Sequence, residues 1–290
     1  MPDNPEVSVV IVTWNSGGEI TRCVSSVIEY SGNINTEIII VDNNSSDNTK
    51  EKLDELNTSY GKKLTLICNT DNRGFTKACN QGMKISTAES IFLLNPDTEL
   101  TKGSLDILIS KLNSERLYGA VAPKLLNEDG TIQKSCRTFP EYSDMFFEMT
   151  LLSSLFPKSK VFSRWKMNYF DHDSEREVDQ PMAAALLIKK SAAEQIGFFD
   201  ERYKMFFNDV DICKKISDSG YKIIFCPGAE VIHTKGVSIY KDRENMIRIW
   251  NKDCAEYFGK HHKNFILQGL LSAGLKLTGI FRILIYKLKK

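Results

Sequence analysis

Two apolar runs near the start of the chain, "VSVVIVTW" at 7–14 and "EIIIVD" at 37–42, decide the fold class. Both have the length of a β-strand, and both are apolar at nearly every position rather than at alternate positions. Two runs of the same kind follow, "LTLICN" at 64–69 and "SIFLLN" at 90–95. Strands of this composition are typically buried on both faces, so these four runs predict a parallel sheet.

Helical patterns separate these strands. The segments Gly18–Tyr30, Asn48–Asn57 and Thr76–Ser86 have helical spacing, and Ser46 or Asp47 is available to cap the second helix. Alternation of strand and helix predicts a right-handed α/β fold, with a Rossmann-like, mostly parallel central sheet flanked by helices.

Polar residues follow each predicted strand, and ligands of open α/β sheets bind at this edge. These residues are Thr13, Asn15, Asp42, Asn72, Asn95 and Asp97. Asn and Asp also make ordinary strand-to-helix turns, which explains any one of them but not four successive strand ends. The sequence has neither G-x-G-x-x-G nor a Walker loop, so the usual dinucleotide and triphosphate fingerprints do not explain the site.

Composition limits the class of protein. The chain has 290 residues, of which 42% are hydrophobic and 26% charged, as in an ordinary globular protein. Its seven cysteines are scattered without a C-x-x-C pair, which favours a reduced, cytoplasmic protein over a disulfide framework or a zinc ribbon. The first residues also lack the basic segment of a secretory signal.

The charge is unevenly distributed along the chain. The formal net charge is +1, yet every charged residue after Glu256 is Lys or Arg, so the preceding body is acidic. An acidic body argues against a nucleic-acid partner. The apolar segment 265–290 contains Lys276 and Arg282, which a spanning helix would have to bury but an interfacial helix would not. This segment predicts a membrane-surface helix, or alternatively a helix packed on the domain or in a homodimer interface.

A known family shares five motifs with this chain. The sequence contains, in order, "VSVVIVTWNS", "EIIIVDNNSSDNT", "NRGFTKACNQG", "FLLNPDTEL" and "GFFDERYKMFFNDVDICKKISDSGYKI" followed by "VIHTKGVS". Together they resemble the family 2 glycosyltransferases of GT-A fold, and within them the rhamnosyltransferase-like enzymes. The resemblance implies a GT-A domain at 1–240, with a nucleotide-binding half at 1–100 and an acceptor and catalytic half at 101–240. A basic amphipathic helical tail at 241–290 would follow it.

The resemblance implies a nucleoside-diphosphate sugar as donor, with dTDP-L-rhamnose expected and UDP-galactose as the alternative. Asp42 would accept the N3–H of thymine or uracil. Gly74 would let the backbone approach the nucleoside closely. The other expected donor-site residues are Thr13, Asn15, Asn72, Arg73, Phe75 and Asn95.

A metal site is implied by "NPD" at Asn95–Asp97, which resembles the D-x-D motif of the family with Asn in the first position. Asp97 would be the principal carboxylate ligand of Mg²⁺ or Mn²⁺. His233 is a second candidate ligand, although a histidine at a strand end is commonly structural. The ion would neutralise charge on the departing nucleoside diphosphate.

The catalytic base is expected in "FFNDVDIC", where Asp209 resembles the carboxylate that takes a proton from the acceptor hydroxyl in an inverting transfer. Alternatively, Asp209 is only an acid in the first turn of a helix. Phe206 and Phe207 would line the sugar pocket and raise the pKa of Asp209. Asn208 replaces the usual Glu, and Asp211 is given a structural or acceptor-binding role.

The acceptor side is less well defined by sequence. In "VDQPMAAALLIKK", Ala183 takes the place of the usual Gly and is expected to line the sugar pocket. Residues 137–177 match no motif, and we expect a mobile insertion near the acceptor cleft. The expected acceptor is a polysaccharide or a lipid-linked glycan at the inner face of the cell membrane. A non-catalytic carbohydrate-binding homologue is the alternative, and Asp97 and Asp209 argue against it.

Overall fold

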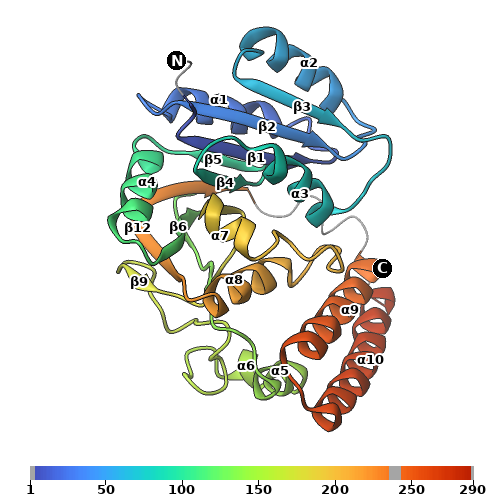
Figure 1. The fold of residues 1–290 in the computed structure, drawn as a ribbon. Coiled ribbons are helices and arrows are strands. Elements are labelled where there is room, and N and C mark those ends of the chain that lie inside the picture. Colours follow the sequence, from blue (N-terminus) through green and yellow to red (C-terminus); the bar gives the residue numbers. More distant parts are fainter. Residues whose placement is uncertain (1–3, 235–242, 289–290) are drawn as a thin grey trace.

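The computed structural model describes residues 4–234 and 243–288, and its centre is a long twisted sheet with helices on both faces (Figure 1). The strands are ordered β3-β2-β1-β4-β11-β6-β12-β5. The first four strands along the chain are β1 (Val7–Thr13), β2 (Thr36–Asp42), β3 (Leu64–Cys68) and β4 (Ser90–Leu94). They pair in parallel, as predicted. β3 forms the edge of the sheet and is partly exposed.

The helices between these strands agree with the predicted segments. They are α1 (Ile20–Tyr30), α2 (Thr49–Tyr60) and α3 (Phe75–Ile85). The backbone N–H of Thr49, the first residue of α2, donates to Asp47 Oδ1 at 3.0 Å. The N-cap position itself is held by Asn48, not by Ser46 or Asp47, and its side chain makes no capping hydrogen bond.

Strand directions change beyond β4. The later strands are β5 (Thr98–Leu100), β6 (Tyr118–Leu126), β7 (Ile132–Gln133), β8 (Cys136–Arg137), β9 (Arg176–Glu177), β10 (Gln180–Pro181), β11 (Ala185–Lys189) and β12 (Lys222–His233). β11 runs antiparallel to both β4 and β6, while β12 runs parallel to β6 and antiparallel to β5. The predicted α/β sheet is confirmed, and it is parallel from β3 to β4 and mixed beyond.

Alternate side chains of each buried strand enter two different cores. Val9 and Ile11 face a core that includes residues of α1, α2 and α4 (Ser104–Ser114). Val10 and Val12 face a core that includes residues of α3, α7 (Lys190–Gln195) and α8 (Asn208–Asp218). Both faces of the strands are therefore covered, which explains why their sequences are apolar throughout.

A third core lies outside the sheet. It joins the start of α8 to α9 (Arg243–His261), α10 (Phe265–Leu288) and α5 (Tyr142–Met149). The tail is thus a pair of helices that lie side by side, with α5 and the short α6 (Leu152–Leu155) next to them (Figure 1). The segment expected to be an insertion contains α5, α6 and β9. The expected domain boundary at 240 lies outside the described residues.

Asp253 fixes α9 to the loop before α8. Its buried carboxylate accepts the backbone N–H groups of Met205 at 3.2 Å and Phe206 at 3.0 Å. Burial raises the pKa of Asp253, and these hydrogen bonds partly offset the rise. The first tail helix is therefore bound to the segment that carries Asp209.

Helix α3 packs closely on β1 at Gly82, where an added Cβ would lie 2.5 Å from Val10 Cγ1. Gly82→Ala should lower the free energy of unfolding by about 1–3 kcal/mol because the helix must move away from β1. Gly269→Ala in α10, where nothing lies within 4 Å, is the control and should raise it by about 0.5–1 kcal/mol. Urea denaturation measures both, and an unchanged Gly82→Ala protein would contradict this packing.

Candidate active site

Hydrogen bonds tie together the loops that follow β1, β2 and β3. Asn15 Oδ1 accepts the backbone N–H of Ser46 at 2.8 Å. Asn43 Nδ2 donates to Asn72 Oδ1 at 2.9 Å, and Asn43 Oδ1 accepts the backbone N–H of Arg73 at 3.0 Å. The loop after β2 therefore bonds to two of the predicted strand-end residues, Asn15 and Asn72, and to the predicted donor-site residue Arg73. Asn43, which the sequence analysis did not single out, holds the third loop in place.

Two of the predicted donor-site residues lie beneath this network. Asp42 is 1% exposed, and its carboxylate accepts both the backbone N–H and the hydroxyl of Ser45. Thr13 is fully buried, and its hydroxyl has no hydrogen-bond partner among the described residues. By contrast, Asn72 and Arg73 are exposed, so they are the groups that a ligand reaches first.

Gly74 and Phe75 join this loop to α3. Gly74 has φ +83°, in the region that favours glycine, and its N–H donates to Asn72 Oδ1 at 3.0 Å. Phe75 makes an edge contact with Phe199, with 6.2 Å between ring centroids. The loop is thus anchored at both ends while Asn72 and Arg73 remain accessible.

The two predicted metal ligands lie together. His233 Nε2 is 3.5 Å from Asp97 Oδ1, and the exposed fractions of the side chains are 7% and 22%. The antiparallel pairing of β12 with β5 places His233 opposite Thr98. A backbone hydrogen bond of 2.9 Å from Thr234 N–H to the carbonyl of Asp97 closes the end of this pairing.

Gln133 determines which nitrogen of His233 carries a proton. Its amide nitrogen donates to the carbonyl of His233 at 3.2 Å and to Asn127 Oδ1 at 3.0 Å. Gln133 Oε1 therefore faces His233 Nδ1, at 2.6 Å, and only an Nδ1–H can bond to it. Neutral His233 then presents a lone pair on Nε2 toward Asp97, so two acceptors converge on one space. Such an arrangement needs a proton or a cation between them.

The donor atoms fit a divalent cation. An imidazole nitrogen with a carboxylate oxygen suits Mn²⁺ better than Mg²⁺, which prefers oxygen ligands in octahedral geometry. Among residues 4–234 and 243–288, no cluster of three or more His, Cys, Asp and Glu side chains is found. The described part of the chain thus offers a pair of ligands, and further ligands would have to be other groups.

Asn95 connects the metal-ligand pair to the acceptor half of the domain. Its backbone N–H donates to the carbonyl of Ala184 at 2.8 Å, and its carbonyl accepts the hydroxyl of Thr98 at 2.6 Å. Ala183 and Ala184 form the turn that leads into β11. The backbone N–H of buried Ala183 in turn lies close enough to the carboxylate of Asp209 to lower its pKa.

Asp209 lies partly exposed in the first turn of α8. Its carboxylate accepts the N–H of Val210 at 2.9 Å and the amide of Gln180 at 2.9 Å. Burial raises the pKa of Asp209, while the hydrogen bonds and the positive charge of Arg137 oppose the rise. The net shift is upward, as expected for a carboxylate that accepts a proton during a reaction.

The sequence analysis missed Arg137 and Gln180, which face each other on β8 and β10. The guanidinium of Arg137 also lies over the ring of Trp165, 5.2 Å from its centroid. Burial lowers the pKa of Arg137, although the nearby carboxylate of Asp209 raises it. Strands of two residues show no periodicity, and Arg137 belongs to no motif. Gln180 lies in the stretch "VDQPMAAALLIKK", of which the sequence analysis singled out only Ala183.

Phe207 belongs to the third core rather than to a sugar pocket. It is 4% exposed and lies among Trp165, Trp250 and Tyr257, with ring centroids 6.5, 5.6 and 5.5 Å away. Its φ of +57° is costly for a residue with a Cβ, and packing holds it there. Phe206, the other predicted pocket residue, is partly exposed.

Asn208 and Asp211 have structural partners. Asn208 Nδ2 donates to the carbonyl of Met205 at 2.7 Å. Asp211 is fully buried and accepts from Lys260 Nζ at 2.6 Å and from His261 Nε2 at 2.7 Å. Burial alone would raise the pKa of Asp211, but the hydrogen bonds from His261 and Lys260 outweigh it and lower the pKa. Of the two roles proposed for Asp211, this geometry favours the structural one.

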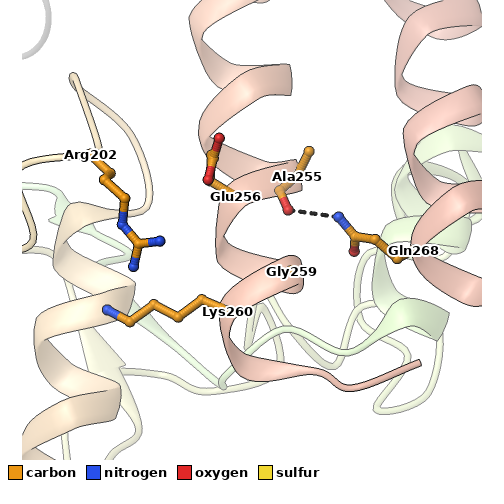
Figure 2. A pocket seen from close by; sticks show the side chains of 6 residues that line it. All are labelled: Arg202, Ala255, Glu256, Gly259, Lys260 and Gln268. Atoms are coloured by element: carbon orange, nitrogen blue, oxygen red, sulfur yellow. Dashed lines mark hydrogen bonds between the residues drawn. The ribbon is translucent and has the colours of Figure 1, made fainter. Parts of the chain in front are cut away.

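A pocket of about 380 Å³ lies beside α9, away from the strand ends. Figure 2 shows Arg202 and Lys260 reaching into the same space, and Gln268 of α10 donating to the carbonyl of Ala255 at 2.8 Å. Both cations are already paired with Asp200, at 2.7 and 2.9 Å. The residues around this pocket therefore connect α9 to the loop before α8. Arg202 and Lys260 are bound to Asp200 and are not free to bind a ligand.

Solved glycosyltransferases have the same fold. The structure of GalNAc-T7 with UDP, GalNAc and Mn²⁺ matches with a TM-score of 0.63 at 18% identity, over 89% of this chain and 50% of that chain. The mannosyltransferase of Pyrobaculum calidifontis, in complex with GDP-Man and Mn²⁺, matches with a TM-score of 0.61 at 16% identity, over 96% and 74%. The present chain thus spans half the length of the first of these proteins. The mixed sheet and these matches define a GT-A fold.

Sequence comparison identifies the family. Residues 8–169 match glycosyl transferase family 2, and the chain belongs to this family. It is 26% identical to the N-acetylglucosaminyl-diphospho-decaprenol L-rhamnosyltransferase of Mycobacterium tuberculosis, over 88% of this chain and 81% of that protein. It is 25% identical to a low-salt glycan biosynthesis hexosyltransferase of Haloferax volcanii, over 80% and 68%.

The Asp97–His233 pair makes a prediction about metal-dependent binding. Asp97→Ala should abolish the Mn²⁺-dependent part of nucleoside diphosphate binding, and His233→Ala should weaken it. Gln133→Leu should lower Mn²⁺ affinity about 10- to 100-fold, because Nδ1 loses the acceptor that fixes the histidine. Asp129→Asn, in an exposed turn, is the control. Isothermal titration measures these affinities, and full wild-type activity in excess EDTA would remove the metal from the mechanism.

Proposed function

We propose that this glycosyltransferase is metal-dependent and inverting, and that it transfers L-rhamnose from dTDP-L-rhamnose to a lipid-linked glycan. One observation carries the proposal: the carbonyl of Ala184 accepts the N–H of Asn95, and the N–H of Ala183 lies close enough to Asp209 to lower its pKa, so a base with a raised pKa and the metal-ligand pair adjoin one turn. The similarity to a mycobacterial L-rhamnosyltransferase over most of both chains supports the donor sugar and the acceptor class.

The donor would bind along the ends of β1, β2, β3 and β4. The accessible Asn72 and Arg73 would contact the nucleoside, above buried Asp42. Asp97 and His233 would hold Mn²⁺. Bound there, the ion would supply positive charge to stabilise the leaving diphosphate. Thymine and uracil present the same N3–H, so a UDP-hexose such as UDP-galactose remains the alternative donor.

Asp209 would take the proton of the acceptor hydroxyl. At the same time the hydroxyl oxygen would bond to the anomeric carbon of the donor sugar, and the bond from that carbon to the diphosphate would break. The attack comes from the face opposite the leaving group and inverts the configuration. The amide of Gln180 fixes one carboxylate oxygen, and the N–H of Val210 fixes the other. Each oxygen keeps lone-pair capacity for the acceptor hydroxyl, since an ionised carboxylate has about four acceptor sites. Arg137 would limit the rise in the pKa of Asp209, so that the group remains ionised when the acceptor arrives.

A lipid-linked acceptor places the reaction beside a membrane. The basic tail would hold the enzyme at the inner face of the cell membrane, where Lys and Arg near anionic lipids contribute roughly 1 kcal/mol each. The protein would remain peripheral.

The donor is tested by thermal denaturation with dTDP-L-rhamnose, UDP-galactose and their nucleoside diphosphates, each with and without Mn²⁺. The correct donor at 100 times its Kd should stabilise the fold by about 2.7 kcal/mol, because it binds only the folded protein. The rise should require Mn²⁺ and be lost in Asp97→Ala. If only UDP-galactose stabilises the fold, then galactose and not rhamnose is the donor sugar. If none of the compounds stabilises the fold, the proposal is contradicted.

The base is tested by Asp209→Asn, which keeps size and hydrogen-bonding capacity but cannot accept the proton. The kcat should fall by roughly 10²- to 10⁴-fold with donor affinity nearly unchanged. Because Asp209 works deprotonated and its pKa is raised, the acid limb of the wild-type pH–rate profile should lie above the ordinary value of 3.8. Arg137→Met should move that limb to still higher pH, since the opposing cation is gone.

Asp211→Asn provides the contrast to Asp209→Asn on the same helix. It should lower the free energy of unfolding by about 1–3 kcal/mol, because a buried charge partner of Lys260 is lost, and should leave the acid limb in place. A fully active but slightly less stable Asp209→Asn enzyme would show that Asp209 is only a helix acid.

A further inference from the structure

The two longest stretches of the sequence without Asp or Glu are 149–170 and 257–290. Both are rich in Lys and Arg, although they are far apart in the chain. The first contains α6 and the loop that follows it, and the second contains α10. The two longest stretches without acidic residues in an otherwise acidic protein are therefore also basic.

The structure places these segments next to each other. α5, which leads directly into α6, packs against α10 (Figure 1). The hydroxyl of Tyr142 donates to Gln268 Oε1 at 3.3 Å. Farther along, the thioether of Met149 lies so close to Gly274 that an added Cβ there would be 2.7 Å from its sulfur. α10 of the second segment therefore packs against α5, whose last residue, Met149, begins the first segment.

Both segments expose apolar side chains. On α10, the buried residues Leu271, Leu275 and Gly279 form one stripe, and the opposite face carries large apolar side chains. The exposed apolar residues of α10 are Phe265, Ile266, Leu267, Leu270, Leu277, Ile280, Phe281, Leu284, Ile285 and Leu288. Those of the neighbouring segment are Phe146, Leu151, Leu155, Phe156 and Val161. Two clusters of this size far exceed the scattered apolar residues of an ordinary surface.

Exposed cations accompany both clusters. Lys158 and Lys160 follow α6, while Lys263, Lys276 and Lys287 precede or lie on α10. Lys276 and Lys287 are three helical turns apart, so they lie on one flank of α10 beside its apolar face. Apolar side chains bordered by Lys fit a surface that is apolar inside and negatively charged outside. An anionic lipid bilayer has this chemistry.

We propose that α10 and the α5–α6 segment together form one docking surface that lies in the interface of an anionic bilayer. α10 is long and apolar enough to cross a membrane, yet crossing would bury Lys276 and Arg282 in hydrocarbon. It would also remove Leu271 and Leu275 from the third core. Docking in the interface keeps both the charges hydrated and the core intact.

The docking surface is connected to the candidate base. The third core joins α10 and α5 to Phe207 and Val210, which flank Asp209 at the start of α8. The inference deepens the proposed function and rests on it in one respect: an acceptor anchored in the same bilayer would approach the half of the domain that carries Asp209.

Vesicle binding by the full-length chain tests the docking surface. The probe is sedimentation with vesicles of phosphatidylglycerol and phosphatidylcholine, compared with phosphatidylcholine alone and with high salt. The wild type should bind only the anionic vesicles, and less in high salt. Leu155→Ser with Phe156→Ser should weaken binding at least tenfold, and so should Phe281→Ser with Leu284→Ser. The control is Leu117→Ser with Ile85→Ser, which are exposed apolar residues outside both segments and should bind like the wild type.

Three results would overturn the inference. Normal vesicle binding by the α6 double variant would leave α10 as the sole contact. Equal binding to neutral and anionic vesicles would show that binding does not require anionic lipid. A wild type that ignores vesicles but forms a dimer disrupted by the α10 variant would make this face an interface between two copies. Thermal shift with the nucleotide-sugar panel on the same variants separates this inference from the proposed function, because docking variants should keep wild-type donor binding.

Discussion

The reversal of strand direction at two places in the sheet is the constraint on which the candidate site depends. Because β11 runs antiparallel to β4, its beginning meets the end of β4, and the Ala183–Ala184 turn reaches Asn95. Because β12 runs antiparallel to β5, its end meets the beginning of β5, and His233 reaches Asp97. In an entirely parallel sheet, the beginning of each strand would lie beside the beginning of its neighbour, and the residues of each pair would be at opposite edges. Strand reversal instead brings together residues more than eighty positions apart in sequence.

Two carboxylates on the same helix show how environment separates their roles. Asp209 and Asp211 both lie in the first turn of α8, and burial favours the protonated form of each. Asp211 receives direct hydrogen bonds from Lys260 and His261, which keep it ionised and tie α8 to α9. Asp209 is bonded to neutral groups and has its cation, Arg137, on a neighbouring strand. The direct ion pairs make Asp211 part of the structure, whereas the weaker opposition leaves the pKa of Asp209 raised, as the proposed role of base requires.

The sequence predicted the elements that show a long apolar run or a periodic apolar face, and it failed where isolated residues matter. The first four strands and β12 follow from their apolar runs, and the first three helices and α8 follow from apolar spacing. Strand direction was harder to predict, since a buried run is apolar whether it is parallel or antiparallel. Gln133, Gln180 and Arg137 lie on strands of two residues, where no period can develop. The tail was predicted as a single basic helical region, but its first helix uses Asp253, Tyr257 and Phe258 to pack against the domain.

The separation of the third core from the sheet has an evolutionary consequence. The nucleotide edge is supported by two cores that the strands share, whereas α5, α9 and α10 pack around a core that meets the sheet domain through α8 and the loop before it. Substitutions at distant sites without shared partners contribute almost independently to stability. Mutations in these helices can therefore accumulate without altering the donor site. A lineage could change the glycan it extends, or the surface on which it works, while it inherits the same donor chemistry.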